Sequence, residues 1–136
     1  MKKIKFGILG LGRVVDLRVA KMFVNELKNS KVTAICDKNN KKLKKFKKKF
    51  QCKAFKSIKN FMKEDLDFVY IATESGNHSK HILESFKHNK NVIVEKPPVL
   101  KVFELKKLNK IAIKKKLKFF VVFQNRYNKS VQYLKK

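Results

Sequence analysis

Two glycines, Gly10 and Gly12, lie in the segment GILGLGRVV, after an apolar run and before a segment of helical period. A G-x-G pair between a strand and a helix is typical of a turn that binds a dinucleotide. Gly10 would permit the tight turn, and Gly12 would let the backbone approach a pyrophosphate at the positive end of the helix. Val15 takes the place of the third small residue of this pattern, so helix and strand would pack less closely. A plain glycine turn is the alternative interpretation.

A carboxylate, Asp37, ends the next apolar run, VTAIC. A carboxylate at that position of a dinucleotide fold can accept hydrogen bonds from both hydroxyls of an adenosine ribose and would repel a 2′-phosphate. Asp37 therefore favours NAD over NADP, although the neighbouring Lys38 would tolerate some NADP. The alternative role for Asp37 is that of an N-cap for the following helix.

A glutamate, a lysine and a proline, Glu95 to Pro97, end the β-branched run Asn91–Val94. Consecutive apolar residues of this kind predict a strand that is buried on both faces. The carboxyl ends of parallel strands are where open α/β sheets bind their ligands. We therefore expect Glu95 and Lys96 to lie at a ligand site.

The elements that would position these residues alternate along the chain. Short apolar runs predict the strands Lys3–Leu9, Lys31–Cys36, Asp67–Ala72, Asn91–Glu95 and Lys118–Phe123. The segments between them have helical period, namely Val14–Lys28, Asn40–Phe50, Ser57–Lys63, Asn77–Asn89 and Lys101–Lys116. This alternation predicts one α/β domain with a doubly wound, Rossmann-type parallel sheet that helices cover on both sides.

The charge of the chain is its unusual feature, because 36 basic and 10 acidic residues give a formal net charge of +26. A basic surface of this kind can bind nucleic acid or an anionic membrane by releasing counterions. The alternative is a solvated surface that uses lysine as its default polar residue. We favour the alternative, because the chain has 33 lysines and three arginines, whereas sites that clamp phosphates or read bases prefer arginine. No specific nucleic-acid partner is expected.

The two cysteines, Cys36 and Cys52, have no paired spacing and predict two buried free thiols, which suit a reducing cytoplasm. The first residues lack the long apolar stretch and the cleavage site of a signal peptide. No run of about 18 apolar residues predicts a transmembrane helix. The expected location is the cytoplasm, with no membrane partner.

Five segments together resemble the N-terminal half of the Gfo/Idh/MocA family of NAD(P)-dependent sugar oxidoreductases. The family signature E-K-P follows its fifth strand and matches Glu95 to Pro97. The other matches, in chain order, are GLGRVV, the pair Cys36 and Asp37, IATESGNHSKHILES and FQNRYNKSVQYLKK. The resemblance covers essentially the whole chain.

The resemblance implies roles for single residues. Lys96 would be the catalytic lysine, whose ammonium contacts the reacting sugar hydroxyl and the nicotinamide ribose and helps to move a proton as hydride leaves carbon. Glu95 would bond ribose hydroxyls or orient Lys96, and a cis peptide before Pro97 would aim Lys96 into the cleft. The residues expected to bind NAD, with NADP less favoured, are Gly10, Gly12, Arg13, Val14, Asp37, Thr73, Ser75, His78, Glu95, Lys96, Asn125 and Arg126.

The segment after the third predicted strand carries one departure and one alternative. Thr73, Ser75 and His78 match the family segment that lines the nicotinamide side, but His78 could equally be an ordinary polar residue in the first turn of a helix. Glu74 stands where the family usually has proline and puts the local geometry in doubt. His78 and His81 have no third ligand at suitable spacing, so no metal site is expected.

The segment QNRYN resembles the branch of the family that oxidises nucleotide-linked amino-sugar uronic acids, such as UDP-N-acetylglucosaminuronate 3-dehydrogenases. Asn125 and Arg126 would then lie where cofactor and sugar meet, and their alternative roles are a helix cap and a surface charge.

The family continues into a second α/β domain that supplies the sugar pocket and the oligomer interface. This chain stops at Lys136, so we expect residues 1–123 to be the dinucleotide-binding domain and residues 124–136 to begin the connection to an absent substrate domain. Hydride transfer needs a sugar held against the nicotinamide, and the chain alone would have little turnover and no usual interface. Two other functions stay open, namely a stand-alone NAD-binding or interaction module and a basic nucleic-acid binder.

Overall fold

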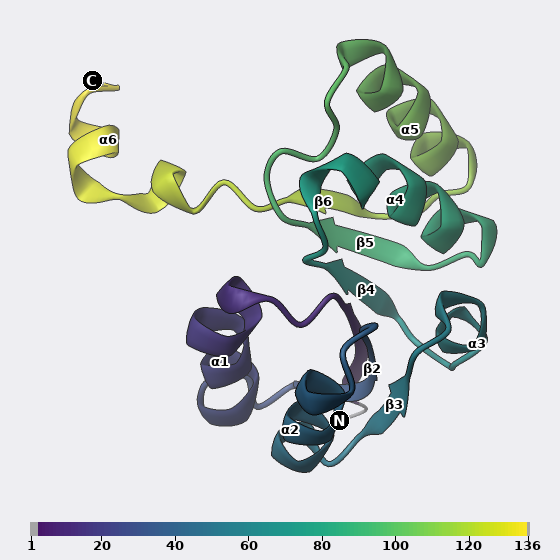
Figure 1. Ribbon diagram of the computed structural model, residues 1–136. Coiled ribbons are helices and arrows are strands. Elements are labelled where there is room, and N and C mark those ends of the chain that lie inside the picture. Colours follow the sequence, from purple (N-terminus) through teal and green to yellow (C-terminus); the bar gives the residue numbers. More distant parts are fainter. Residues whose placement is uncertain (1–2, 136) are drawn as a thin grey trace.

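The computed structural model describes residues 3–135. They form a six-stranded, wholly parallel sheet in the order β3-β2-β1-β4-β5-β6 (Figure 1). The strands are β1 (Ile4–Leu9), β2 (Ser30–Cys36), β3 (Lys53–Phe55), β4 (Phe68–Ile71), β5 (Asn91–Val94) and β6 (Phe119–Val121). The predicted Rossmann-type doubly wound sheet is confirmed.

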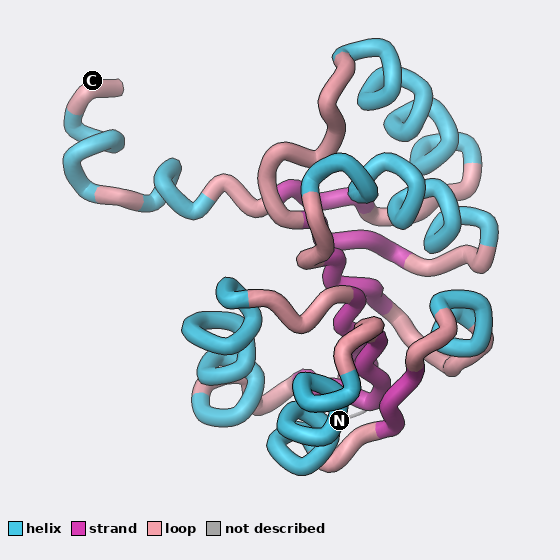
Figure 2. Tube along the Cα trace, viewed as in Figure 1, coloured by secondary structure: helices cyan, strands magenta, loops and turns pink. Residues whose placement is uncertain are grey.

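Helices cover the two faces of the sheet (Figure 2). On one face pack η1 (Val15–Val19), α1 (Ala20–Asn25) and α2 (Asn40–Phe50). On the other face pack α3 (Ile58–Met62), α4 (His78–Lys87), which follows the short η2 (Ser75–Asn77), and α5 (Val102–Lys114). The remaining elements, η3 (Gln124–Tyr127) and α6 (Lys129–Tyr133), lie on an arm that leaves the body of the domain after β6.

The order of the strands places a crevice next to β1. From β1 the chain builds outward through β2 to β3, and then it returns to the other side of β1 with β4. Helices on opposite sides of the sheet therefore diverge at the carboxyl ends of β1 and β4. Such a reversal point is where open α/β sheets bind ligands.

Helix α2 illustrates how the sequence specifies an element here. The side chain of Asn39 caps it by accepting a hydrogen bond from the backbone N–H of Lys42 at 3.1 Å. Leu43 and Phe46 are buried on one stripe, and the lysines between them are exposed. Gln51 ends the helix in the left-handed conformation. The lysine tract is therefore the solvated face of an amphipathic helix, as predicted.

Two local features differ from the expectation. Strand β3 is absent from the five predicted runs, because it has three residues, Lys-Ala-Phe, none of them fully buried, and pairs only with β2 at the sheet edge. The first helix begins with a π-helical turn, in which the N–H of Ala20 bonds the carbonyl of Val15, and it ends at Asn25 rather than Lys28. Val15 is fully buried. The wider turn thus admits valine where the glycine pattern expects a small residue.

The cysteines are both free, but they differ in exposure. Cys36 is buried in β2, as predicted, whereas Cys52 is only half-buried, because it lies in the turn before the edge strand β3. Burial raises the pKa of the Cys36 thiol to about 12 and that of Cys52 to about 11. Both thiols are therefore protonated at neutral pH. Their location in a reducing cytoplasm stays a prediction.

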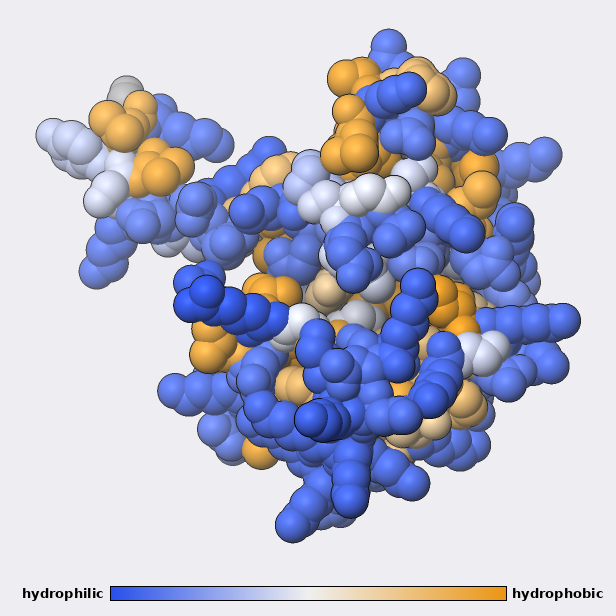
Figure 3. All heavy atoms as spheres, viewed as in Figure 1, coloured by the Kyte–Doolittle hydropathy of each residue, from blue (hydrophilic) through white to orange (hydrophobic). Residues whose placement is uncertain are grey.

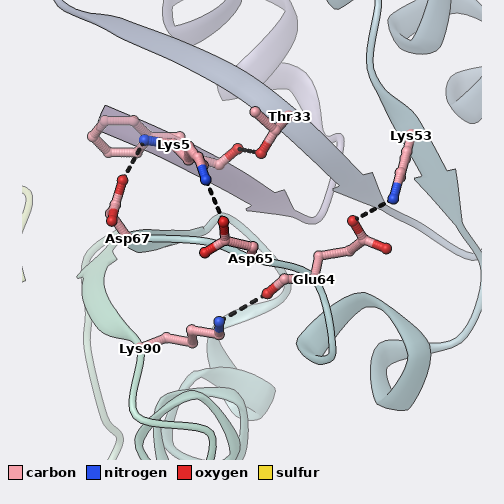
Figure 4. A network of polar contacts seen from close by, with 8 residues as sticks. Lys5, Thr33, Lys53, Glu64, Asp65, Asp67 and Lys90 are labelled. Carbon is pink, nitrogen blue, oxygen red and sulfur yellow. Dashed lines mark hydrogen bonds and ion pairs between the residues drawn. The ribbon is translucent and has the colours of Figure 1, made fainter. Parts of the chain in front are cut away.

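Acidic residues gather at the amino ends of the central strands (Figure 4). The backbone N–H of Lys5 in β1 donates to Asp67 at 2.7 Å, and its ammonium pairs with Asp65. Nearby, Lys53 of β3 pairs with Glu64 at 2.9 Å. Exposed pairs of this kind add little stability. These pairs lie at the amino ends of the strands, on the side of the sheet opposite the crevice.

The face of the molecule drawn in Figure 3 is mostly hydrophilic. Its apolar groups include some on α5 and on the C-terminal arm. Between residues 3 and 135, no helix is both long and apolar enough to span a bilayer.

The core under α4 gives a direct test of the fold. Phe86 is fully buried and meets Phe119 edge-on, with ring centroids 5.6 Å apart. Phe86→Ala should lower the free energy of unfolding by about 3–5 kcal/mol, because it leaves a cavity. Phe103→Ala, at an α5 position that is 64% exposed, should change it by less than about 0.5 kcal/mol. Urea unfolding followed by circular dichroism measures both, and equal effects would contradict this packing.

Candidate functional site

A cleft of ≈ 630 Å³ lies at the carboxyl ends of β1, β2 and β4. We call it the carboxyl-edge cleft. Its walls include the glycine turn, the start of the β2–α2 connection and the segment between β4 and α4. Of the predicted cofactor residues, it brings together Gly10, Gly12, Asp37 and Thr73.

Position 10 must be glycine because the ends of β1, β2 and β4 lie close together around it. Its φ is +90°, and a Cβ built on it would lie 2.7 Å from the carbonyl of Ala72 and 2.8 Å from the nitrogen of Thr73. Its N–H donates to the carbonyl of Cys36 at 2.8 Å. The turn after β1 is thus pressed against the peptide that follows β4 and bonded to the end of β2.

Gly12 has a different reason to be glycine. The atom nearest to a Cβ built there is the carbonyl oxygen of Ala72, at 3.9 Å, so the protein itself leaves room for a side chain. The carbonyl of Gly12 accepts from the N–H of Val15 at 3.1 Å, which places Gly12 at the start of the first helix. The missing side chain therefore leaves open the part of the cleft at the positive end of that helix.

Asp37 is held in place by the backbone. One carboxylate oxygen accepts from the N–H of Leu11 at 2.7 Å, and the other accepts from the N–H of Asn39 at 2.8 Å. Asn39, and not Asp37, caps α2, so the N-cap alternative for Asp37 is wrong. A carboxylate has about four acceptor positions, so two remain for a ligand. The bond to Leu11 joins Asp37 to the glycine turn, a role that the sequence did not indicate.

Charged side chains surround the mouth of the cleft. Lysines come from two connections and from the helices α2 and α4, and the acidic residues are Asp37 and Glu74. The pKa of Glu74 is lowered, first by a hydrogen bond from its own backbone and then by the side chain of Asn77. Its φ of −62° is the value that proline would impose, so glutamate in place of proline leaves the turn geometry intact. The lysines are Lys38, Lys42, Lys56 and Lys80.

Glu95 and Lys96 lie beyond the end of β5, outside the residues that line the cleft. The N–H of Glu95 donates to the carbonyl of Ile71 at 2.9 Å and continues the ladder between β4 and β5. Its carboxylate accepts from the hydroxyl of the buried Tyr70, whose pKa is raised by burial and by this bond. The peptide between Lys96 and Pro97 is cis, as the resemblance implies. Lys96 is exposed.

Two histidines of α4 hold the segment that follows β4. His78 is 1% exposed, and its ring nitrogens lie 2.8 Å from the carbonyl oxygen of Thr73 and 2.7 Å from that of Pro97. The ring of His81 lies 2.9 Å from the hydroxyl of Thr73. Burial lowers the pKa of His81, with a smaller contribution from Lys80. In residues 3–135 no three potential ligands gather to form a metal site.

Cofactor binding stays a prediction for all of the residues expected to bind NAD, and the remaining ones lie outside the lining of the cleft. Arg13 is exposed and Val14 half-buried at the start of the first helix, and Ser75 begins η2. Asn125 and Arg126 are exposed on η3, and the guanidinium of Arg126 lies 5.1 Å from the ring centre of Phe123. The side chain of Asn128 caps α6, so the cap alternative for Asn125 does not apply.

Some residues of the site escaped the sequence analysis. Tyr70 looked like one more apolar residue of a buried run, and His81 was considered only as a metal ligand. The available signal for Tyr70 was its place in β4, beside the strand β5 that Glu95 follows. Lys42 and Lys56 were hidden among the many other lysines of the chain.

Residues 4–123 match the model of the Gfo/Idh/MocA group, described as an oxidoreductase family with an NAD-binding Rossmann fold. The chain belongs to this family. The recognition made from the five segments is therefore confirmed.

Solved structures agree with this assignment. The WlbA dehydrogenase from Chromobacterium violaceum, in complex with NADH and UDP-GlcNAcA, is 27% identical with a TM-score of 0.93, over 99% of this chain and 39% of that one. The apo scyllo-inositol dehydrogenase from Lactobacillus casei is 28% identical with a TM-score of 0.88, over 98% and 40%.

A curated relative adds a different substrate class. L-aspartate dehydrogenase of Methanocaldococcus jannaschii is 31% identical over 91 residues, which are 67% of this chain and 34% of that protein. The chain thus spans between 34% and 40% of the length of these three relatives.

The geometry of Gly10 yields a test with a matched control. Gly10→Ala should abolish or strongly weaken dinucleotide binding and cost about 1–3 kcal/mol of stability, because alanine would be strained at this φ and would press on the backbone of Ala72. Gly76→Ala should change neither, since nothing lies within 4 Å of its built Cβ. Thermal unfolding and calorimetric titration with NADH measure the two effects. Normal binding by the Gly10 variant would contradict the role of this turn.

Proposed function

We propose that this chain binds NAD in the carboxyl-edge cleft and serves as the cofactor half of a dehydrogenase. The reaction would move hydride from a hydroxyl-bearing carbon of a sugar or nucleotide-sugar to the nicotinamide. The observation that carries the proposal is the convergence of Gly10, Gly12 and Asp37 on one cleft. The strand β5, which Glu95 and Lys96 follow, is the neighbour of β4.

The residues of the cleft fit the adenosine and pyrophosphate parts of the cofactor. Asp37 has free acceptor positions for ribose hydroxyls, and Gly12 leaves the positive end of the first helix open to a pyrophosphate. Asp37 and Glu74 are both negative, which disfavours the 2′-phosphate of NADP, whereas the surrounding lysines attract any anionic nucleotide. Together, these charges favour NAD over NADP.

Lys96 is the residue proposed to act on the substrate. When bound, the nicotinamide supplies the hydride acceptor. The Lys96 ammonium would hydrogen-bond the reacting hydroxyl and take part in moving its proton, and Glu95, held by Tyr70, would bond the ribose or orient Lys96. Within residues 3–135 the Lys96 ammonium has no ion-pair partner, which leaves it available to a substrate.

The nature of the substrate is proposed from the relatives. WlbA was crystallised with a UDP-linked sugar acid, and the Lactobacillus protein is an inositol dehydrogenase, so a polyhydroxylated ring is the substrate class proposed for this chain. We propose residues 1–123 as the NAD domain and residues 124–136 as the start of the connection to a substrate-binding part like that of the longer relatives. Tyr127, Tyr133 and Leu134 on this arm are about four-fifths exposed, at 82%, 79% and 84%. Such apolar exposure suits a segment that packs against further protein.

NAD binding is tested by calorimetric titration of the chain with NAD and NADH. Saturable binding of one dinucleotide is expected, and Asp37→Ala should weaken it about tenfold or more through loss of the ribose bonds and of the bond to Leu11. Asp16→Ala is the control, because Asp16 lies on the first helix and pairs with Lys45. Unchanged affinity of the Asp37 variant would contradict the ribose assignment.

Duplex DNA in a parallel titration separates the nucleic-acid alternative. Weak binding that vanishes near physiological salt would reflect only counterion release by the lysines, and it is the expected result. Tight binding that persists at physiological salt, without dinucleotide binding, would favour a nucleic-acid binder instead.

The catalytic role of Lys96 is tested in protein expressed from the complete gene, with NADH absorbance as the signal and a panel of sugars and nucleotide-sugars as substrates. Lys96→Met should lower kcat by about 100-fold or more, because proton transfer by a positioned group contributes that much. Lys101→Met, at an exposed position just before α5, is the control. Equal activities of the two variants would exclude Lys96 from the chemistry.

A further inference from the structure

The backbone of Lys96 is fixed on both sides. Before it, Glu95 is bonded through its N–H to Ile71 and through its carboxylate to Tyr70. After it, the carbonyl oxygen of Pro97 lies 2.7 Å from ring nitrogen Nδ1 of His78. The lysine that the proposed function needs is therefore placed by its two neighbours in the chain.

His78 bridges two loops of the site. It is the first residue of α4, and its second ring nitrogen lies 2.8 Å from the carbonyl oxygen of Thr73, in the segment after β4. Pro97 lies in the loop after β5, and β4 and β5 are adjacent in the sheet. One buried ring thus joins the loops at the carboxyl ends of two neighbouring strands.

Both ring nitrogens of His78 are occupied by the protein. Their partners are carbonyl oxygens, which only accept, and they lie 2.7 and 2.8 Å from the two ring nitrogens. With the ring 1% exposed, neither nitrogen is left for a cofactor or a substrate. The position expected from the family resemblance to line the nicotinamide side is instead turned inward.

We infer that His78 is a positioning residue for Lys96: by holding the Pro97 carbonyl against the Thr73 segment, it sets the direction in which the lysine enters the site. This inference rests on the proposed function. It assigns His78 its main effect at the nicotinamide end of the cofactor, because Gly12 and the two backbone N–H groups that hold Asp37 belong to other loops.

The helix that carries His78 is anchored independently of the ring. Ile82, Ser85 and Phe86 of α4 are all fully buried, and Phe86 packs edge-on against Phe119 of β6. Loss of the imidazole should therefore release the bridge between the loops while α4 stays docked. This separation makes a substitution at His78 informative.

The experiment compares two ligands on one protein. ADP-ribose carries the adenosine and the pyrophosphate of NADH but no nicotinamide. For His78→Gln we expect NADH affinity to fall about tenfold and ADP-ribose affinity to stay within about twofold of wild type. His88→Gln, the same change at the other end of α4 where His88 meets Glu84, is the matched control and should alter neither.

A double-mutant cycle tests whether His78 acts through Lys96. Lys96→Met alone should also weaken NADH and spare ADP-ribose, and the double variant should be no weaker than Lys96→Met, because coupled residues are non-additive. A role in the fold alone would give additive losses, or equal losses for the two ligands, and either result would overturn the inference. His78→Asn is the second variant if the glutamine variant proves unfolded by circular dichroism.

The two proposals fail in different ways. If the wild-type chain binds neither NADH nor ADP-ribose, the proposed function is overturned, and this inference with it. If the wild-type chain binds both and His78→Gln binds NADH as tightly, only the positioning role of His78 is overturned.

Discussion

The close approach of Gly10 to the peptide between Ala72 and Thr73 is the contact on which the rest of the site depends. At φ +90°, with less than 3 Å between its built Cβ and that peptide, any side chain would push β1 and β4 apart at their carboxyl ends. The same turn bonds the end of β2 through Gly10 and Asp37 through Leu11. Three strand ends, and with them the positions of Gly12 and Asp37 in the cleft, are thus set by one glycine.

The positive charge of the chain affects ligand attraction but does not determine the fold. The net charge of +26 comes from lysines, many of them on solvated helix faces such as that of α2, where they leave the apolar stripe intact. Long-range attraction raises the local concentration of any anionic ligand, so it cannot by itself select one. The choice among anionic ligands must depend on the few carboxylates of the cleft. Of these, Asp37 is oriented by two backbone N–H groups.

The fold was predictable because parallel strands buried on both faces read as continuous apolar runs, and five of them alternate with amphipathic segments. Strand β3 escaped because its three residues begin with an exposed lysine and show no such run. Gly10, Gly12 and Asp37 could be placed at one cleft because the ends of parallel strands meet at one edge of a sheet. Asn125 and Arg126 could not be placed, because the arm that carries them leaves the body of the domain.

The sequence by itself determined the α/β class, the G-x-G turn and the family, since each depends on local pattern or on motifs of adjacent residues. Only the tertiary structure decided what holds the Glu95–Lys96 turn. Tyr70 and Glu95 are 25 residues apart, and His78 and Pro97 are 19 apart. These pairs meet because β4 and β5 lie side by side in one register and α4 folds back over them. Which of these residues meet depends on how the helices and strands pack. The local sequence pattern does not contain that information.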